Sequence, residues 1–597
     1  NDLAAAYRAT ADERYARAWV AQFRSFAEQC PPPPALRADN TIGSTWRTIE
    51  CGIRSMWTWP VAFHTFLRSP TVTDDDLLAW LHCSLDHARY LAQNPSSASN
   101  WLTMEMSGLY AIAAAFPEFT GAPAWRRTAI DTQYEQLAAQ FLPDGAQFEL
   151  STSYHNVARD NITGIFSLAQ ALGLDAEFPP GYLARVRRAY DFNLHLMAPD
   201  RRLPRLNDSD TVHVPGTLRQ ALSFFPDRSD YRWIVTDGRQ GTPPATTSHL
   251  FEYAGYAIMR TGWQPDATYA LFDAGPLGAA HQHQDKLNLL LWSHGRELLF
   301  DSGGGSYERS KWREYGIDTH SHNTILVDGK PQRRDPRDLA ANVATAPLDL
   351  HWKTTPARDY AADVYNEGYG DLHTRPATHT RRVLFLKPDI LVVADTIVPN
   401  DKTPHTAQAR WHLRTPATRH DPATGQAITT DAGLPNLAII PLSTDNLETA
   451  AISAQTEPEI LGWDVRKDTI PQCVPATTVL HTRRAIAGPQ HFLTLLLALP
   501  ATADPARNPL AAPPPLPPPH HPPRPPPRVR SACSSRTDAT SSSTPASPPP
   551  PSLPYLHFND TEGGKIKNQE SRKRTHAHEP RMTIHQPTIQ PTIQPAT

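Results

Sequence analysis

The sequence predicts an α+β multidomain protein in which a helical domain is followed by an antiparallel β domain and then by a disordered Pro-rich tail. Through roughly the first 240 residues, apolar residues recur three and four positions apart, which is typical of amphipathic helices. From about residue 250 the chain turns to short segments rich in Val, Ile, Leu and aromatic residues, which favours strands. Helices first and strands second indicate two packed domains.

Residues 1–240 are expected to form the helical domain. Stretches such as Tyr15–Phe26, Leu77–Leu91 and Thr128–Phe141 are rich in Ala, Leu, Glu and Arg, which favour helix. Breakers such as Pro179–Gly181 separate the stretches, and their spacing predicts roughly eight to ten helices. No repeat of fixed length is visible, so a regular solenoid is not indicated.

Residues 241–502 are expected to form the β domain. The clearest predicted strands are Tyr269–Asp273, Asn288–Trp292, Thr324–Val327 and Ile390–Ala394. Turn residues bound several of these segments. Many short strands with such turns indicate an antiparallel sheet or sandwich.

Low-complexity sequence makes up residues 503–597. Of the 60 prolines, 24 lie after Leu499, and the end of the chain repeats Thr-Ile-Gln-Pro. The segment lacks apolar periodicity, so we expect it to be disordered. We interpret it as a dispensable tail, with a functional linker or stalk as the alternative.

Composition excludes several classes of protein. Lys and Arg number 57 and Asp and Glu 60, a near balance that argues against a dedicated nucleic-acid binder. No apolar run is long enough for a membrane span, so no membrane insertion is expected. Five cysteines are too few for a disulfide scaffold, which leaves one disulfide or free thiols open. Because the chain begins at Asn1 and not at Met, the missing signal peptide says little about export.

The densest group of polar residues is the run His-Gln-His-Gln-Asp at residues 281–285. On an extended segment its two histidines and Asp285 would point to the same face. Asp301 follows an apolar strand, and His322 precedes another. Histidines and a carboxylate from neighbouring strands can hold a divalent metal, zinc in the first place. Structural histidines and a turn-capping aspartate are the alternative.

Weaker groups carry the other candidates. Tyr154 and His155 lie at a predicted helix start, where they could supply an acid and a base, although this feature alone favours a capped helix with Tyr154 packed in the core. Asn100 opens another predicted helix and is typical of an N-cap. Asn207 lies in a run Asn-Asp-Ser-Asp that fits either a turn or a site loop. No nucleotide-binding glycine motif or nucleophile elbow is found in a fitting context.

Taken in order, these groups resemble those of the heparinase II/III-like polysaccharide lyases, most closely the heparinase III branch, which acts on heparan sulfate. The similarity covers roughly residues 1–500 and rests on Asn100–Leu109, Asp144–His155, His281–Asp285, Asp301–Gly303 and Ser321–Asn323. The resemblance implies an N-terminal incomplete (α/α) toroid packed on an antiparallel β-sandwich domain. The tail has no counterpart in the family.

The same resemblance implies β-elimination of uronic-acid polysaccharides, a reaction that adds no water. Asn100, with help from His155, would hold the uronate carboxylate. Tyr154 would be the acid and, for one uronate epimer, also the base. His281 would be the other base, since the pKa of histidine lies near neutrality. Tyr154 and His281 would face each other across the cleft between the two domains.

A structural metal is also implied by the resemblance. His283, Asp301 and His322 match the metal positions of the family. Zinc is the first choice and calcium the alternative. The metal would fix the strands that present the base and would not activate water.

Arg159, Arg205, Asn207 and Trp101 are the candidates for substrate binding, because guanidinium groups bind planar anions in a bidentate manner and aromatic rings stack on sugars. Surface charge and core packing are the alternatives, and Arg313 is a further candidate. The expected partner is a uronic-acid polysaccharide, and the chain is expected to be a monomer or a homodimer. The family implies a periplasmic or secreted bacterial enzyme.

Three other functions stay open at this point. An alginate or other uronate lyase would share the fold and the motifs. A non-catalytic carbohydrate-binding protein would bind polymer and release no unsaturated product. A metal-dependent hydrolase using the same histidines would release saturated ends.

Overall fold

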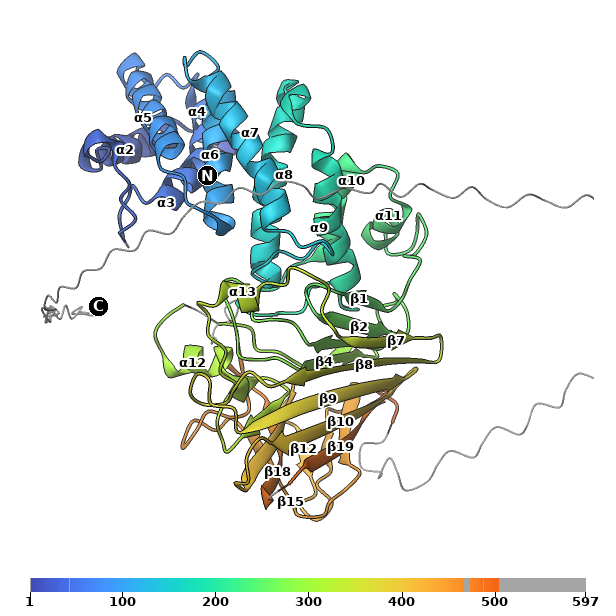
Figure 1. Ribbon diagram of the computed structural model, residues 1–597. Helices are drawn as coiled ribbons and strands as arrows, with labels where there is room; N and C mark the ends of the chain where they lie inside the picture. The colour runs from blue at the N-terminus through green and yellow to red at the C-terminus, as the bar shows by residue number, and fades with distance from the viewer. Residues whose placement is uncertain (1, 42, 306, 467–472, 487, 504–597) are drawn as a thin grey trace, which may run out of the picture. The chain divides into compact units, whose positions relative to one another are not determined.

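The computed structural model describes residues 2–41, 43–305, 307–466, 473–486 and 488–503, which belong to one compact unit (Figure 1). Helices come first and strands second, which confirms the predicted fold class. Except for residue 503, the predicted tail lies outside the described residues. Within the described part, no helix is long and apolar enough to cross a membrane.

The first part of the chain is helical. Of the three stretches predicted from periodicity, two lie within α2 and α5, and the third begins in α7 and extends two residues beyond its end. The elements are α1 (Asp2–Thr10), α2 (Glu13–Gln29), η1 (Pro34–Leu36), α3 (Thr48–Ile53), η2 (Arg54–Thr58), α4 (Trp59–Phe66), α5 (Asp74–Gln93), α6 (Ser99–Ala115), α7 (Ala122–Ala139), α8 (Thr152–Leu172), η3 (Asp175–Glu177), α9 (Tyr182–Leu196), α10 (Val214–Phe224) and α11 (Ser229–Val235).

Local sequence explains where the helix α8 begins and ends. The Ser151 hydroxyl accepts a hydrogen bond from the backbone N–H of Tyr154 at 3.3 Å, as an N-cap does. Gly173, with φ of 70°, closes the other end in the left-handed conformation. The cap therefore places Tyr154 in the first turn of α8.

Helix α6 lies at the centre of the helical half and is buried along most of its length. It crosses α3 where Gly52 meets Gly108. A Cβ on Gly52 would lie 2.8 Å from the Met104 carbonyl oxygen, and one on Gly108 would lie 2.6 Å from the Gly52 carbonyl oxygen. This close crossing fixes α6, whose first turn carries Asn100.

The second part of the chain is an antiparallel β-sandwich with two large sheets and a small hairpin. The first sheet has the order β1-β2-β3-β4-β5-β11-β18-β15, with β6 paired to β11; the second has the order β12-β13-β14-β19-β10-β9-β8-β7; β16 and β17 form the hairpin. One apolar core fills the space between the sheets. The predicted domain boundary at residues 240–241 falls between α11 and β1.

The remaining elements are β1 (His249–Phe251), β2 (Tyr256–Arg260), β3 (Tyr269–Asp273), β4 (Asn288–Ser293), β5 (Arg296–Leu299), α12 (Lys311–Ile317), η4 (Thr319–Ser321), β6 (Ile325–Val327), α13 (Leu339–Asn342), β7 (His351–Thr354), β8 (Arg358–Tyr365), β9 (Ala377–Leu386), β10 (Ile390–Pro399), β11 (His405–Leu413), β12 (Thr418–His420), β13 (Ala427–Thr429), β14 (Asn436–Pro441), β15 (Leu447–Ser453), β16 (Trp463–Val465), β17 (Cys473–Pro475), β18 (Thr477–Ile486) and β19 (Gln490–Leu499).

A single hydrophobic cluster joins the helical half to the first sheet. It contains helix residues such as Phe192 together with Tyr256 of β2 and Tyr269 of β3. The hydroxyl of Tyr256 donates to the Leu150 carbonyl at 3.0 Å, and that of Tyr269 to the Leu196 carbonyl at 2.8 Å. Strands β2–β4 are therefore buried on both faces, which explains why they read as continuous apolar runs.

Two buried histidines should make the helical half sensitive to acid. Burial lowers the pKa of both His87 and His155 to about 3, helped by Arg54 and Arg159 respectively. Because the folded pKa lies below the unfolded value near 6.5, their contribution to stability is complete above pH 6.5 and is lost as pH falls towards 3. We expect each histidine to cost about 2 kcal/mol in unfolding free energy at pH 5.

Urea unfolding at pH 7.5 and pH 5 measures this loss. The variant His155→Gln removes one of these titrating groups, so its unfolding free energy should fall less between the two pH values than that of the unmodified chain. An equal fall in both proteins would contradict the assignment.

Candidate active site

Tyr154 and His281 meet where the helical half contacts the first sheet. Tyr154 comes from the first turn of α8, and His281 from the loop that leads into β4. His281 has a φ of 59°, a left-handed conformation that few residues other than glycine adopt. The two rings stack with centroids 3.5 Å apart and planes 11° apart. They contact each other directly, whereas the sequence analysis expected them to face each other across a cleft.

A buried carboxylate lies behind His281. Nδ1 of His281 is 2.9 Å from Oε2 of Glu149, whose side chain is fully buried. Because a carboxylate accepts, Nδ1 carries the hydrogen, and the lone pair of neutral His281 lies on Nε2. Glu149 also accepts from the Asn100 side-chain amide at 3.2 and 3.3 Å. Asn100, Glu149 and His281 therefore form one hydrogen-bonded line.

A second tyrosine contacts the hydroxyl of Tyr154. The two hydroxyl oxygens of Tyr154 and Tyr307 are 2.8 Å apart. Burial and the bond to Tyr154 raise the pKa of Tyr307 above its ordinary value. The Arg313 guanidinium lies over the Tyr307 ring, 5.0 Å from its centre. A cation is thus placed next to the pair of phenols.

Asp208 links Arg313 to the histidine run. Arg313 donates from both terminal nitrogens to the Asp208 carboxylate, one of them at 2.7 Å. Oδ1 of Asp208 is also 3.2 Å from Nε2 of His283. Burial would raise the pKa of Asp208, but the hydrogen bonds with His283 and Arg313 lower it far below its ordinary value.

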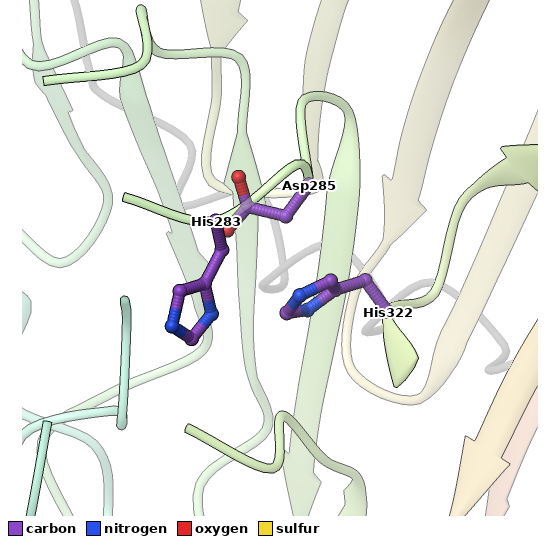
Figure 2. Close-up of side chains that lie close together, drawn as sticks. All are labelled: His283, Asp285 and His322. Atoms are coloured by element: carbon purple, nitrogen blue, oxygen red, sulfur yellow. The ribbon is translucent and has the colours of Figure 1, made fainter. Parts of the chain in front are cut away.

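Three buried residues are arranged as metal ligands. One ligand atom each from His283, Asp285 and His322 lies within 4.8 Å of the others. Figure 2 shows the two imidazole rings next to each other, with His283 and Asp285 on one loop and His322 on another segment. Each residue also has a buried polar atom without a hydrogen-bond partner: Nδ1 of His283, Oδ2 of Asp285 and Nε2 of His322. Two histidines and a carboxylate with unsatisfied atoms fit a divalent cation such as zinc.

The carboxylate of this group is Asp285 and not Asp301, the residue that the family resemblance implied. Asp301 is already fully engaged: its oxygens accept from the Gly303 backbone at 2.9 Å and from the Asn288 side chain at 2.7 Å, and one lies 2.9 Å from Nδ1 of His322. Burial alone would lower the pKa of His322, but Asp301 raises it to about 9. Asp301 therefore orients His322, as carboxylates behind metal-binding histidines do.

Three predicted site residues contact other groups of the helical half. His155 is buried between α8 and α9, where Nε2 donates to the Ala189 carbonyl at 3.0 Å, so its expected help with the substrate carboxylate is not supported. Arg159 is also buried and pairs with Asp160 at 2.6 Å. Trp101 packs against the guanidinium of Arg47, 5.1 Å from the ring centre.

Two other residues that were predicted to bind substrate, Arg205 and Asn207, bond to neighbouring groups of the protein. Arg205 pairs with Asp464 at 2.9 Å and donates to the Ser302 carbonyl at 3.1 Å. The Asn207 side chain donates to the Leu150 carbonyl at 3.2 Å and accepts from the His283 backbone at 2.9 Å. Both side chains therefore connect parts of the protein through hydrogen bonds, and Arg205 also through an ion pair.

Sequence reasoning missed Glu149, Asp208 and Tyr307. Glu149 and Asp208 lie in segments that the sequence analysis singled out, but nothing in their spacing distinguishes them from loop residues. Tyr307 follows a run of three glycines and carries no signal at all. Asp285 did carry one, since alternation places it on the face of its two neighbouring histidines.

Comparison with known proteins decides the family. The family model described as heparinase II/III N-terminus matches residues 1–233, and that described as heparinase II/III-like, C-terminal, matches residues 243–461. The chain belongs to the heparinase II/III-like family. The two matches together run through both halves of the fold and confirm the resemblance seen in the motifs.

Several family members share substantial identity with the chain. A heparin-sulfate lyase from Pedobacter heparinus is 29% identical over 403 residues, which cover 66% of this chain and 58% of that protein. A heparin-sulfate lyase from Bacteroides thetaiotaomicron is 26% identical over 428 residues, 66% of this chain and 57% of that protein. The chain thus spans a little over half the length of these relatives.

Solved structures of similar proteins share the fold of this chain. The crystal structure of heparan sulfate lyase HepC from Pedobacter heparinus has a TM-score of 0.62 at 25% identity and covers 83% of this chain and 75% of that chain. A crystal structure of heparinase III has a TM-score of 0.71 at 20% identity, again over 83% and 75%, which supports the family fold.

Replacing Gly304 by Ala tests how tightly the loop before Tyr307 packs. A Cβ at this position would overlap the side chains of Asp208 and Arg313. We expect the substitution to lower the unfolding free energy by about 1–3 kcal/mol, as overpacking does, measured by urea unfolding. Gly262→Ala is the matched control, because no atom lies within 4 Å of its added Cβ. Equal stability of the two variants would contradict tight packing, because the loop would then have moved to accommodate the added methyl group.

Proposed function

We propose that the chain is a polysaccharide lyase that cleaves heparan-sulfate-like, uronic-acid-containing glycosaminoglycans by β-elimination. The relatives in both comparisons are named as lyases of heparin sulfate or heparan sulfate. The observation that carries the proposal in this chain is the contact between the Tyr154 phenol and the His281 imidazole. An acid and a base held side by side are what an elimination requires.

The reaction removes the proton on C5 of a uronate, which is weakly acidic because C5 lies next to a carboxylate. In the proposed mechanism Nε2 of His281 takes this proton. The electrons of the C5–H bond form the C4–C5 double bond, the C4–O4 bond breaks, and the Tyr154 hydroxyl gives a proton to O4. For the other C5 epimer, Tyr154 serves as both base and acid. The polymer reaches the exposed edges of the two stacked rings.

Glu149 and Asn100 have supporting roles in this proposal. Glu149 holds His281 in the tautomer whose Nε2 accepts a proton, and it balances the positive charge that forms on the imidazole. Asn100, whose side-chain amide donates to Glu149, is the proposed partner of the substrate carboxylate. An amide donor stabilises the negative charge that builds up on that carboxylate during the reaction. His155, buried elsewhere, has no part.

Tyr154 needs help to lose a proton, since a free tyrosine has a pKa of about 10. The hydroxyl of Tyr307 can donate a hydrogen bond to the Tyr154 phenolate, and the nearby Arg313 cation favours negative charge on the pair. We therefore include Tyr307 and Arg313 among the site residues.

His283, Asp285 and His322 are the proposed ligands of a structural divalent metal, with zinc as the first choice. When bound, the metal would cross-link the loop before β4 to the segment before β6. Asp208 and Asp301 orient the two histidines. We propose no role for the metal in the elimination, because that reaction needs no activated water.

A periplasmic or secreted location and a monomeric or dimeric state stay predictions. Digestion of heparan sulfate, chondroitin sulfate, hyaluronan and alginate, followed by the ultraviolet absorbance of the unsaturated uronate, tests the substrate. We expect the fastest rise with heparan sulfate. A rise with alginate alone would favour the other lyase of this fold, and polymer binding without any rise would favour a binding protein.

Tyr154→Phe and His281→Ala test the proposed acid and base. Each should lower the rate on heparan sulfate at least 1,000-fold, while the melting temperature changes by no more than a few degrees. Tyr134→Phe, at a half-buried tyrosine on α7 whose hydroxyl donates to the Pro180 carbonyl, is the matched control and should keep full activity. Rates near those of the control in either variant would refute the assignment.

The variants Asp285→Asn and Asp301→Asn distinguish the aspartate that binds the metal from the aspartate that orients His322. We expect Asp285→Asn to abolish bound zinc, measured by elemental analysis, and Asp301→Asn to weaken zinc binding about 10–100-fold. His322→Ala should lower the melting temperature more than it lowers the rate. Full zinc content in Asp285→Asn, with none in Asp301→Asn, would return the ligand role to Asp301.

A further inference from the structure

A buried arginine of the second sheet contacts both segments that carry the proposed metal ligands. Arg381 lies at an inward-pointing position of β9 and is fully buried. Its guanidinium lies next to the Trp411 ring of β11 in the first sheet, 5.3 Å from the ring centre. An arginine is rarely buried to this extent unless its charge is paired, so its bonds show what it does.

Asp395 balances the charge of Arg381 from the neighbouring strand β10, where the two residues lie directly opposite each other. Nε donates to Oδ1 at 2.7 Å and Nη2 donates to Oδ2 at 3.1 Å, so the pair is bidentate. Nε2 of His379 is 2.8 Å from the same carboxylate. Burial would raise the pKa of Asp395, but Arg381 and His379 lower it to about 2. The ion pair leaves Nη1 of Arg381 available for other bonds.

Nη1 of Arg381 donates to two carbonyl oxygens, one on each ligand-bearing segment. It lies 2.7 Å from the carbonyl oxygen of Leu287 and also bonds that of Asn323. Leu287 comes two residues after Asp285, and Asn323 directly follows His322. One nitrogen therefore joins the loop before β4 to the segment before β6, the same two segments that the proposed metal would cross-link.

The backbone of Leu287 is strained. Its φ is 70°, a left-handed conformation that leucine seldom adopts. Leu287 is the third residue of a turn that Asp285 opens, since the Asn288 N–H donates to the Asp285 carbonyl at 3.0 Å. Strained residues persist where surrounding bonds determine their conformation. The Leu287 N–H donates to the Asp273 carbonyl at 2.7 Å, and Arg381 holds the other side of the residue through its carbonyl oxygen.

We propose that Arg381 is a positioning residue of the candidate metal centre. Anchored in the second sheet by Asp395, its guanidinium fixes the turn that presents Asp285 relative to the segment that presents His322, and it is not itself a ligand. The inference rests on the proposed metal site and is independent of the proposed elimination reaction.

The zinc affinity of the full chain, measured by competition with a chromophoric chelator, tests the proposal. Arg381→Lys keeps the positive charge but loses the planar fork that bonds Asp395 and the two carbonyl oxygens at once. We expect the dissociation constant for zinc to rise about 10–100-fold, as it does when groups behind metal ligands are changed. The visible spectrum of bound Co²⁺ should change as well, because it depends on the geometry of the ligands.

Arg260→Lys is the matched control. Arg260 is also buried, and its Nη2 likewise donates to two carbonyl oxygens, that of His195 at 3.0 Å and that of Met197 at 2.7 Å. These bonds lie at the junction with the helical half and involve neither ligand-bearing segment. Arg260→Lys should therefore lower the melting temperature, as Arg381→Lys does, but keep the zinc affinity and the Co²⁺ spectrum of the unmodified chain.

The double variant Arg381→Met/Asp395→Leu separates positioning from stability and replaces Arg381→Lys should that variant not fold. Exchanging a buried ion pair for apolar side chains leaves no unpaired charge and is often neutral for stability. The double variant should still weaken zinc binding at least tenfold, because the carbonyl groups of Leu287 and Asn323 lose their donor.

Full zinc affinity in either Arg381 variant would overturn the proposal. An equal loss of affinity in Arg260→Lys would do the same, because the loss would then follow from general destabilisation. An unmodified chain that binds no zinc would refute the proposed metal site and this inference with it. Zinc binding that depends on Asp285 but not on Arg381 would refute the inference alone.

Discussion

The buried carboxylate of Glu149 is the interaction on which the candidate site depends. It receives hydrogen bonds from Asn100 of α6 and from His281 of the β half, so three distant segments meet on one group. A buried charge is costly unless it is fully bonded, which makes this meeting point specific. The position of the His281 ring, and with it the stacking on Tyr154, follows from this bond. A residue that was not recognised within its motif thus sets the geometry of two residues that the motifs did reveal.

The tyrosine pair and the histidine group are mechanically connected. Asp208 contacts both His283 and Arg313, Arg313 lies over Tyr307, and Tyr307 bonds Tyr154. A cation on His283 would therefore influence where the phenols lie without contacting the substrate. In the proposed mechanism, this connection would let a structural metal affect the rate without acting as a Lewis acid.

The sequence predicts the order of helices and strands well, because periodicity reports burial directly. Through the family resemblance it also places Tyr154 and His281 in one site, although it expects a cleft between them where the structure has direct contact. The sequence is a poorer guide to residues whose role depends on the direction in which the side chain points. On α8, His155 is turned about 100° from Tyr154 and Arg159 about 140°, so both point into the helical core. Asp285 and Asp301 are both plausible ligands from spacing, and only the structure distinguishes them, through the position of Asp285 beside the two histidines and the hydrogen bonds of Asp301. The roles of Asn100, Tyr154 and His281 in catalysis stay predictions.

The junction between the halves has a consequence for how the molecule folds. Strands β2–β4 pack one face on the core of the sandwich and the other face on the helical cluster, so both faces are shielded from solvent at this junction. A fragment holding either half alone would expose a broad sheet of tyrosine and leucine side chains. The (α/α) and β portions should therefore melt in one cooperative transition, as a single folding unit and not as two independent modules.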